Sequence, residues 1–320
     1  MEKPKIGLAL GCGAARCLAH IGVLKVLEKY QIPVDIVTGT SMGAFIGGAY
    51  ASGIKVSVME EISLNADWKL NAMMFFPTIS FSGFINGKRI KEFLKNVIGN
   101  RNIEELDRKF ACVATDILTG DEIVIDQGSL IEAIRASISI PTIFTPVYHG
   151  NRFLVDGGIV NPVPVDLARR MGADIVIAVN VIPLNASPLK KEKMKKEEID
   201  YQKVNIALAN NLKNKIDELI KFSKISEVFK KEEKEKYFSP NFINVTLNTI
   251  NIFEREIIKL RLEKDKPDFL IEPDTSNANL KVFYKGKEAI QAGEEAASKI
   301  IPAIKKYIER KQKWIQKELS

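Results

Sequence analysis

The sequence predicts an α/β protein with a mostly parallel central sheet covered by helices. From Lys5 to Asn180, short β-branched runs alternate with helical patterns, as in chains built from successive strand and helix units. Two glycine-rich segments, Gly11–Arg16 and Gly39–Gly43, each follow one of these runs and precede a helical pattern. With 320 residues and 46% hydrophobic composition, the chain is long enough to bury one large core.

Strands are predicted where β-branched residues cluster, and helices where apolar residues recur every three or four positions. The predicted strands, in order, are Lys5–Leu10, Val34–Thr38, Phe110–Asp116, Glu122–Asp126, Asp174–Val181 and a short buried run at Asp268–Glu272. The predicted helices, in order, are His20–Tyr30, Met42–Ser52, Gly87–Val97, Leu130–Ile138, Val165–Met171, Thr246–Leu262 and Gly286–Lys313.

A change of composition after Pro183 predicts three parts. Residues 1–183 form the α/β core, residues 184–240 an inserted helical segment, and residues 241–320 the part that completes the core. The insert is rich in lysine and glutamate, and Val204, Leu208 and Leu212 lie four apart on one helix face. A solvated helix face and a lid or membrane-surface element both fit this pattern.

Charge and cysteine content limit the partners. A net charge of +7 suits an anionic partner, and no nucleic-acid-binding motif accompanies it, so an acidic lipid surface is favoured over nucleic acid. No apolar run approaches the roughly 20 residues of a membrane-spanning helix, and no secretory signal is evident. We expect a cytoplasmic protein, with peripheral contact to an anionic membrane as an open alternative. Three cysteines and two histidines without paired spacing predict no metal or other cofactor.

The strongest local signal is Gly39-Thr40-Ser41-Met42-Gly43, between a predicted strand and a helix of small residues. It matches a nucleophile elbow, in which a serine on a sharp turn needs glycine two residues before and two after it. Gly39 and Gly43 would support the turn, and Ser41 would lie exposed at the N-terminus of a helix, where developing negative charge is favoured. A glycine-rich turn with an N-capping serine is the alternative.

The loop after the first strand is predicted to be an oxyanion hole. Its small residues allow backbone N–H groups to point toward an anion. A dinucleotide-binding loop would need a third glycine where Arg16 stands, and Asp35 precedes its strand instead of ending it. Arg16 would add positive charge or brace the loop. The residues assigned to this hole are Gly11, Cys12, Gly13, Ala14, Ala15 and Arg16.

A serine nucleophile also needs a base. His20 has apolar neighbours and fits a core histidine, and His149 lies in a polar turn that fits an exposed hairpin tip. Asp156 is the better candidate, because Gly157 and Gly158 allow a tight turn that could hold its carboxylate against Ser41. A plain Asp-Gly turn is the alternative.

Taken together, these motifs resemble those of patatin-like phospholipases, in the same order along the chain. The resemblance rests on the glycine loop with its arginine, the elbow, the Asp156-Gly157-Gly158 turn and the segment Ala136–Pro141. It covers Lys5 to Asn180 and weakly resumes from Thr246. It implies a three-layer α/β/α fold, a Ser41–Asp156 dyad, an acyl-enzyme intermediate, and hydrolysis of acyl esters of phospholipids, lysophospholipids or neutral lipids without a metal.

Some features depart from the family pattern or leave alternatives open. Cys12 and Cys17 stand where glycine is usual; a lowered thiol pKa at Cys17 and simple burial under the loop are both open. The aromatic-rich segment Met73–Phe84 fits an acyl pocket or ordinary core. An acyltransferase and a lipid- or partner-binding module without catalysis are the rival functions. Head-group preference, chain length and oligomeric state do not follow from the sequence.

Overall fold

The computed structural model describes residues 3–65, 87–184, 242–275 and 286–318, which belong to one compact unit. The predicted insert, apart from its first residue, and the segment Met73–Phe84 lie outside the described residues, as does any membrane contact that they were expected to make. Within the described ranges, no helix is long and apolar enough to cross a membrane.

The centre of the fold is an eight-stranded sheet in the order β5-β6-β3-β2-β1-β7-β8, with β4 also paired to β3. Strands β1, β2, β3, β7 and β8 run parallel, whereas β4, β5 and β6 form antiparallel pairs. Their bounds are β1 Ile6–Leu10, β2 Ile36–Thr40, β3 Lys109–Asp116, β4 Glu122–Ile125, β5 Val147–His149, β6 Arg152–Asp156, β7 Ile175–Val179 and β8 Phe269–Ile271.

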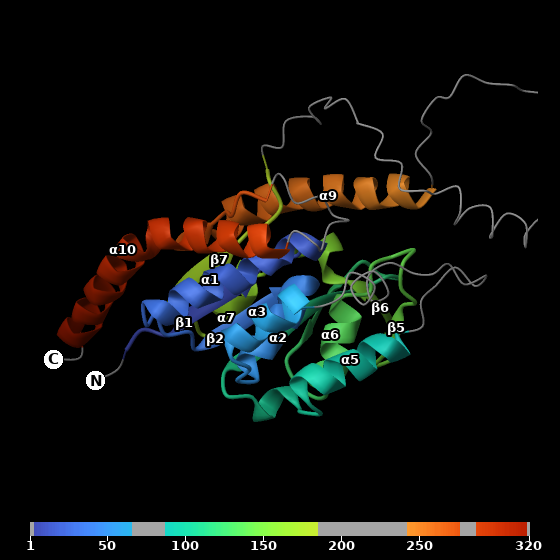
Figure 1. Ribbon diagram of the computed structural model, residues 1–320, viewed down its shortest axis with the longest axis horizontal. Coiled ribbons are helices and arrows are strands. Elements are labelled where there is room, and N and C mark those ends of the chain that lie inside the picture. Colours follow the sequence, from blue (N-terminus) through green and yellow to red (C-terminus); the bar gives the residue numbers. More distant parts are fainter. Residues whose placement is uncertain (1–2, 66–86, 185–241, 276–285, 319–320) are drawn as a thin grey trace, which may run out of the picture. The chain divides into compact units, whose positions relative to one another are not determined.

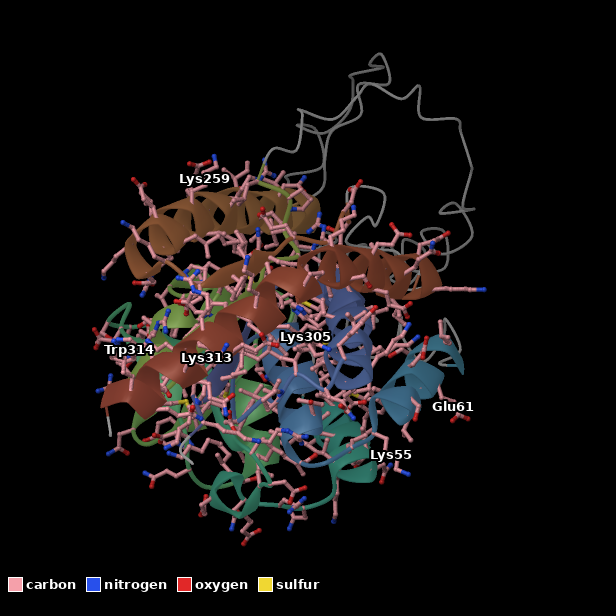
Figure 2. All side chains as sticks on the ribbon, turned by 90° about the vertical axis from the view of Figure 1, so that its left-hand side faces the viewer. Lys55, Glu61, Lys259, Lys305, Lys313 and Trp314 are labelled. Atoms are coloured by element: carbon pink, nitrogen blue, oxygen red, sulfur yellow. The ribbon has the colours of Figure 1, made fainter. Side chains whose placement is uncertain are left out.

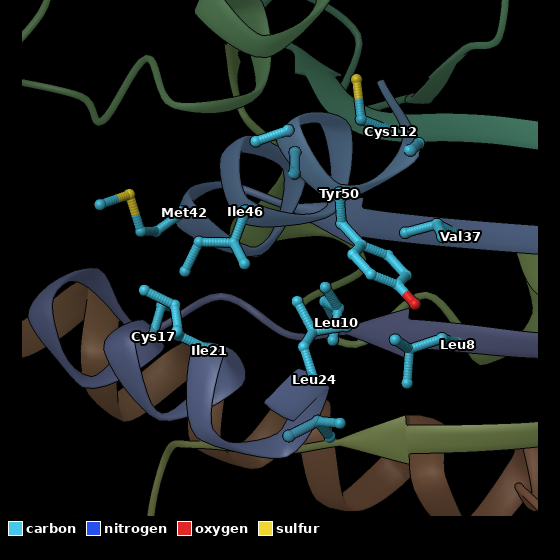
Figure 3. Packing of buried hydrophobic residues seen from close by; sticks show 14 of the residues in the cluster. Leu8, Leu10, Cys17, Ile21, Leu24, Val37, Met42, Ile46, Tyr50 and Cys112 are labelled. Atoms are coloured by element: carbon cyan, nitrogen blue, oxygen red, sulfur yellow. The ribbon is translucent and has the colours of Figure 1, made fainter. Parts of the chain in front are cut away.

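Side-chain alternation along the parallel strands builds a core on each face of this sheet. In β1, Leu8 and Leu10 join a large cluster with α1 and α2, while Ala9 joins a second cluster with Val165 of α7 and Ile258 of α9. Figure 3 shows the first of these cores, where the side chains of α1 and α2 meet those of β1 and β2. Two apolar faces covered by helices give the three-layer α/β/α fold that was predicted.

The helices on the first face include α1, α2, α3, α5, α6 and α10, and those on the second are α7 and α9. Helix α1 packs along α10, so the first helix and the last lie side by side (Figure 1). Their bounds are α1 Leu18–Lys29, α2 Met42–Ala51, α3 Val56–Asn65, α5 Lys88–Ile98, α6 Leu130–Ser137, α7 Val165–Arg170, α9 Phe242–Asp265 and α10 Gly286–Glu318.

Helix α10 is amphipathic. Ile301 and Ile304 are buried in the core, whereas Lys305, Lys313 and Trp314 are exposed along its length (Figure 2). This is the pattern of a helix that covers a core with one stripe and meets water with the rest.

Two strands meet end to end along one edge of β3. Successive residues of a strand direct their N–H groups to opposite sides. Lys109 N–H donates to Asp35, just before β2, and Ile117 N–H donates to Phe153 of β6, so β2 and β6 lie on the same side of β3. Asp116 N–H donates to Asp121, on the β4 side. The carboxyl ends of β2 and β6 therefore face each other on this edge.

Most predicted elements are confirmed to within a few residues, and the differences matter near the site. Strand β2 runs to Thr40 instead of Thr38, so it continues up to Ser41 itself. Helix α1 begins at Leu18, after a 3₁₀ turn at Ala14–Cys17. Strands β5 and β6 and helix α3 were not predicted. Asp156 therefore ends a strand, where only a turn was expected.

The contact between α1 and α10 predicts an unusual response to a small substitution. A Cβ on Gly293 would overlap the carbonyl oxygen of Ala19, although alanine is otherwise favoured over glycine in helices by about 1 kcal/mol. We expect Gly293→Ala to lower the free energy of unfolding by about 1–3 kcal/mol, the usual cost of overpacking. Urea denaturation measures it. The matched control is Ser298→Ala on the exposed side of α10, which should change stability by less than about 0.5 kcal/mol; equal effects would contradict the close helix contact.

Candidate active site

Ser41 lies on a sharp turn between β2 and α2. Its φ of 56° and ψ of −127° are unusual for a residue with a side chain. A Cβ on Gly39 would lie 2.6 Å from Cα of Ala44, and one on Gly43 would overlap the carbonyl oxygen of Leu10. Both glycines are therefore required by close backbone approach, as the nucleophile-elbow pattern predicts.

The meeting of β2 and β6 on β3 brings Ser41 to Asp156. Thr40, the last residue of β2, pairs with Val113, and Asp156, the last residue of β6, pairs with the adjacent Ala114. The Ser41 hydroxyl donates a hydrogen bond to Oδ2 of Asp156 at 2.5 Å. Both side chains are buried.

The second carboxylate oxygen of Asp156 accepts a hydrogen bond from Gly158 N–H at 2.8 Å, across the short 3₁₀ turn Gly157–Ile159. Burial raises the pKa of Asp156 to about 6, while the hydrogen bonds from Ser41 and Gly158 act in the opposite direction. A carboxylate with this pKa is a stronger base than an exposed aspartate and is ionised at neutral pH.

Ser137 anchors the elbow from behind. Its hydroxyl accepts the N–H of Ser41 at 2.8 Å and donates to the carbonyl oxygen of Val113 at 2.6 Å. Ser41 is thus tied to α6 and β3 as well as to its own strand. We did not assign Ser137 a role from sequence, although it lies in the Ala136–Pro141 segment that carried part of the family resemblance.

The glycine loop divides into anchored and unpaired donors. The N–H groups of Gly11 and Cys12 donate to the carbonyls of Val179 and Pro162, and that of Arg16 donates to Gly13. Those of Gly13, Ala14 and Ala15 have no partner among the described residues. Gly13 and Ala14 also have positive φ, 151° and 51°. Of the six residues assigned to the oxyanion hole, Gly13 and Ala14 combine a positive φ with an N–H group that is free in the described part of the chain. The N–H groups of Gly11, Cys12 and Arg16 already donate to carbonyl oxygens.

His20 holds the glycine loop in place through a hydrogen bond to its backbone. Its Nε2 lies 2.8 Å from the carbonyl oxygen of Gly11, which can only accept, so this nitrogen carries the proton. Burial lowers the pKa of His20 to about 4, and the ring is neutral at pH 7. His149 is exposed on the β5–β6 hairpin, as expected. Neither histidine is hydrogen-bonded to Ser41.

The hypothesis of a lowered thiol pKa at Cys17 is wrong. Burial raises the pKa of Cys17 well above its ordinary value, and that of Cys12 rises for the same reason. Cys17 instead donates a weak hydrogen bond to the carbonyl oxygen of Gly11. Both thiols pack beneath the loop as small apolar groups. Within the described ranges, no three His, Cys, Asp or Glu side chains are grouped closely enough to hold a metal ion.

Helix α9 supplies a further carboxyl group. Arg16 extends from the loop toward α9, where its guanidinium lies 3.5 Å from the side-chain oxygen of Asn251. One turn later, Glu254 hydrogen-bonds with Cys12, raises the pKa of Arg16 electrostatically, and has its own pKa raised by the charge of Asp156. Glu254 was not identified from sequence, because nothing in a long helix pattern shows which of its acidic residues faces the sheet.

A serine on a strained strand-to-helix turn, with its hydroxyl hydrogen-bonded to a carboxylate, is typical of α/β proteins with a nucleophile elbow. The family model described as patatin-like phospholipase matches residues 8–169, about half of the chain, and the chain belongs to this family. The match includes Ser41, Asp156 and the glycine loop.

Individual relatives share the same region. An NTE family protein of Mycobacterium tuberculosis is 34% identical over 180 residues, 56% of this chain and 50% of its own length. A patatin-like phospholipase domain-containing protein of Caenorhabditis elegans is 39% identical over 184 residues, and a lysophospholipase of Aspergillus fumigatus is 33% identical over 182; these matches cover 55% of this chain and 13% and 12% of those proteins. The chain thus matches half or less of each relative's length.

Removal of the Ser137 hydroxyl tests the anchoring of the elbow. Ser137→Ala leaves the buried N–H of Ser41 without its acceptor, and we expect the free energy of unfolding to fall by about 1–3 kcal/mol. Chemical denaturation measures the change. Ser63→Ala is the control, because the Ser63 hydroxyl bonds only to a carbonyl of its own helix and its loss should cost less than about 0.5 kcal/mol. Equal losses in the two variants would show that Ser137 does not anchor the turn.

Proposed function

We propose that the protein hydrolyses fatty-acyl esters of phospholipids, lysophospholipids or related lipids, with Ser41 as nucleophile and Asp156 as its base. The observation that carries the proposal is the 2.5 Å hydrogen bond from Ser41 to a buried Asp156 on a nucleophile elbow. Both histidines of the chain have other positions, His20 under the loop and His149 on a hairpin. The carboxylate is therefore the group in place to take the proton.

Acylation follows from this geometry. As the Ser41 oxygen attacks the ester carbon, its proton moves to Asp156, and the carbonyl oxygen becomes an oxyanion. Asp156 then gives the proton to the departing alcohol, and the fatty acid remains esterified to Ser41. In the second half, Asp156 takes a proton from water, the hydroxide attacks the acyl-enzyme, and the proton returns to Ser41 as the fatty acid leaves.

The oxyanion needs donors that are free and already in place. The N–H groups of Gly13 and Ala14 meet this requirement, and that of Met42 is a further candidate, since it follows the nucleophile at the first position of α2. Each such donor typically contributes about 10²–10³ in rate. The positive charge of Arg16 adds to this field. The neutral His20 keeps the loop in position through the Gly11 carbonyl.

Family membership supports lipid esters as the substrate class. One relative with 33% identity over the matched region is described as a lysophospholipase. Head group and chain length are open, and a panel of esters has to establish them.

Two substitutions at the Ser41–Asp156 pair test the mechanism. We expect Ser41→Ala and Asp156→Asn each to lower kcat by about 10³-fold or more, because one removes the nucleophile and the other its base. Release of p-nitrophenol from short and long acyl esters, and of fatty acid from a lysophospholipid, measures the loss. Circular dichroism checks that both variants remain folded.

The control for Asp156→Asn is Asp126→Asn, which removes an exposed carboxylate after β4. Its activity should equal that of the wild type. Near-normal turnover by Asp156→Asn would exclude the dyad, and no turnover by a folded wild type would favour the binding-module alternative. Products analysed with glycerol added would separate a hydrolase, which yields free fatty acid, from an acyltransferase, which yields a glycerol ester.

Activity should depend on pH through Asp156. With its pKa near 6, the base is protonated and inactive below this pH, so the acidic side of the kcat/KM profile should rise with pH through about 6. Stability should respond in the opposite direction. A pKa raised from 3.8 to about 6 contributes stability below pH 3.8 that is lost as pH rises through about 6. A pH–rate profile with its midpoint near 4 would contradict the desolvated base.

A further inference from the structure

Three polar side chains converge on Gly158 next to the Ser41–Asp156 pair. A Cβ placed on Gly158 would lie 2.5 Å from Oε1 of Glu254, 3.2 Å from Oδ1 of Asp156 and 3.2 Å from Sγ of Cys12. Asp156 begins the turn Asp156–Gly158, which we call the base turn. Cys12 belongs to the glycine loop Gly11–Arg16, and Glu254 belongs to α9. The carboxyl of Glu254 thus lies in the corner formed by the base turn and the glycine loop, which is the proposed oxyanion loop.

Among the described residues, the groups that act on the pKa of Glu254 all belong to these segments. They are Asp156 at the end of β6, Cys12 in the loop and Arg16 in the 3₁₀ turn. Arg255, next to Glu254 on α9, faces Arg16 instead. In the part of the chain that the structure describes, Arg16 is the one cation that acts on Glu254, and its side chain is itself partly buried. The corner therefore places two carboxyl groups and a thiol against a single positive charge.

Two neighbouring carboxyl groups do not both ionise readily in such a place. Burial raises the pKa of Glu254 to about 8, and the negative charge of Asp156 acts in the same direction. Asp156 loses its proton first, because Ser41 O–H and Gly158 N–H both donate to its anionic form. Between pH 6 and 8 the pair holds one proton, and Glu254 carries it.

We propose that Glu254 is a positioning residue of the Ser41–Asp156 pair: its neutral carboxyl bridges the base turn and the oxyanion loop, and its ionisation lowers activity. This inference rests on the proposed hydrolase function and adds to it a residue from a part of the chain that the family model does not match.

The direction of the effect follows from where charge moves during turnover. An ionised Glu254 would increase the proton affinity of Asp156, which helps the base to take a proton and equally hinders its return to the leaving alcohol. Its effect on the oxyanion is unfavourable in both half-reactions. The charge repels the oxyanion and neutralises the field of Arg16 in the loop where that oxyanion forms. The net result over a full cycle is a loss of rate.

The test compares pH–rate profiles of the full chain, each normalised to its own maximum. Wild type should give a bell-shaped profile, with a rise near pH 6 and a fall above about 8 to a lower rate. Glu254→Gln should lose the alkaline fall and keep the midpoint of the acidic rise, because Glu254 is already neutral where Asp156 titrates. Glu254→Asp should restore an alkaline fall.

The matched control is Glu256→Gln, which neutralises an exposed carboxylate two positions further along α9 and should reproduce the wild-type profile. An alkaline fall that persists in Glu254→Gln overturns the proposal. So does an acidic midpoint that moves to lower pH in that variant, because it would mean that Glu254 is ionised at neutral pH.

A second measurement needs no substrate. The pKa of Glu254 is raised from 4.5 to about 8, so wild type should lose stability relative to Glu254→Gln as pH rises through this window. A difference in unfolding free energy that does not change with pH overturns the proposal even in an active enzyme. If the wild type loses stability relative to Glu254→Gln as expected but hydrolyses no ester, the hydrolase proposal is excluded. The assignment of the proton to Glu254 is then still supported.

Discussion

The site depends on the end-to-end meeting of β2 and β6 along one edge of β3. The two strands come from distant parts of the chain and run in opposite directions, yet their last residues pair with adjacent positions, Val113 and Ala114. Backbone hydrogen bonding thereby determines the separation of Ser41 and Asp156. If β6 paired with β3 one residue out of register, the side chain of Asp156 would point to the other face of the sheet.

This placement also sets the chemistry of the carboxylate. A strand end covered by helices is poor in water, and desolvation raises the pKa of Asp156 while two hydrogen bonds keep the anion in place. The same burial keeps His20 neutral and both loop thiols protonated, so neutral groups support the loop and the negative charge is concentrated at Asp156. Close packing at Gly39, Gly43 and Gly157 makes this burial possible, because a Cβ at any of them would collide with backbone.

Local patterns predicted the elements of this fold well and their long-range meeting poorly. The elbow was identifiable because its two glycines and its serine lie within five residues. The mostly parallel sheet with covering helices followed from alternating strands and helices, and the three-layer arrangement was implied by the family resemblance. A hairpin tip was expected at His149, but its strands β5 and β6 were not predicted, so Asp156 could be placed only in a turn. Ser137 and Glu254 could not be assigned, since their roles depend on contacts 96 residues away in one case and on the face of a long helix in the other. Among the loop residues, only the structure distinguishes the engaged N–H groups of Gly11 and Cys12 from those of Gly13 and Ala14.

Helix α9 shows how a segment outside the matched family region can take part in the site. Ile258 fixes the helix to the core beneath α7, and Glu254 and Asn251, one and two turns earlier, lie toward the glycine loop. The apolar contact supplies the energy that holds the helix, and the polar residues on the adjoining turns then meet Arg16 and the base turn at little further entropic cost. A carboxyl delivered in this way need not be part of the elbow or of its loop to affect both, because in a desolvated corner each added charge changes the proton affinity of its neighbours.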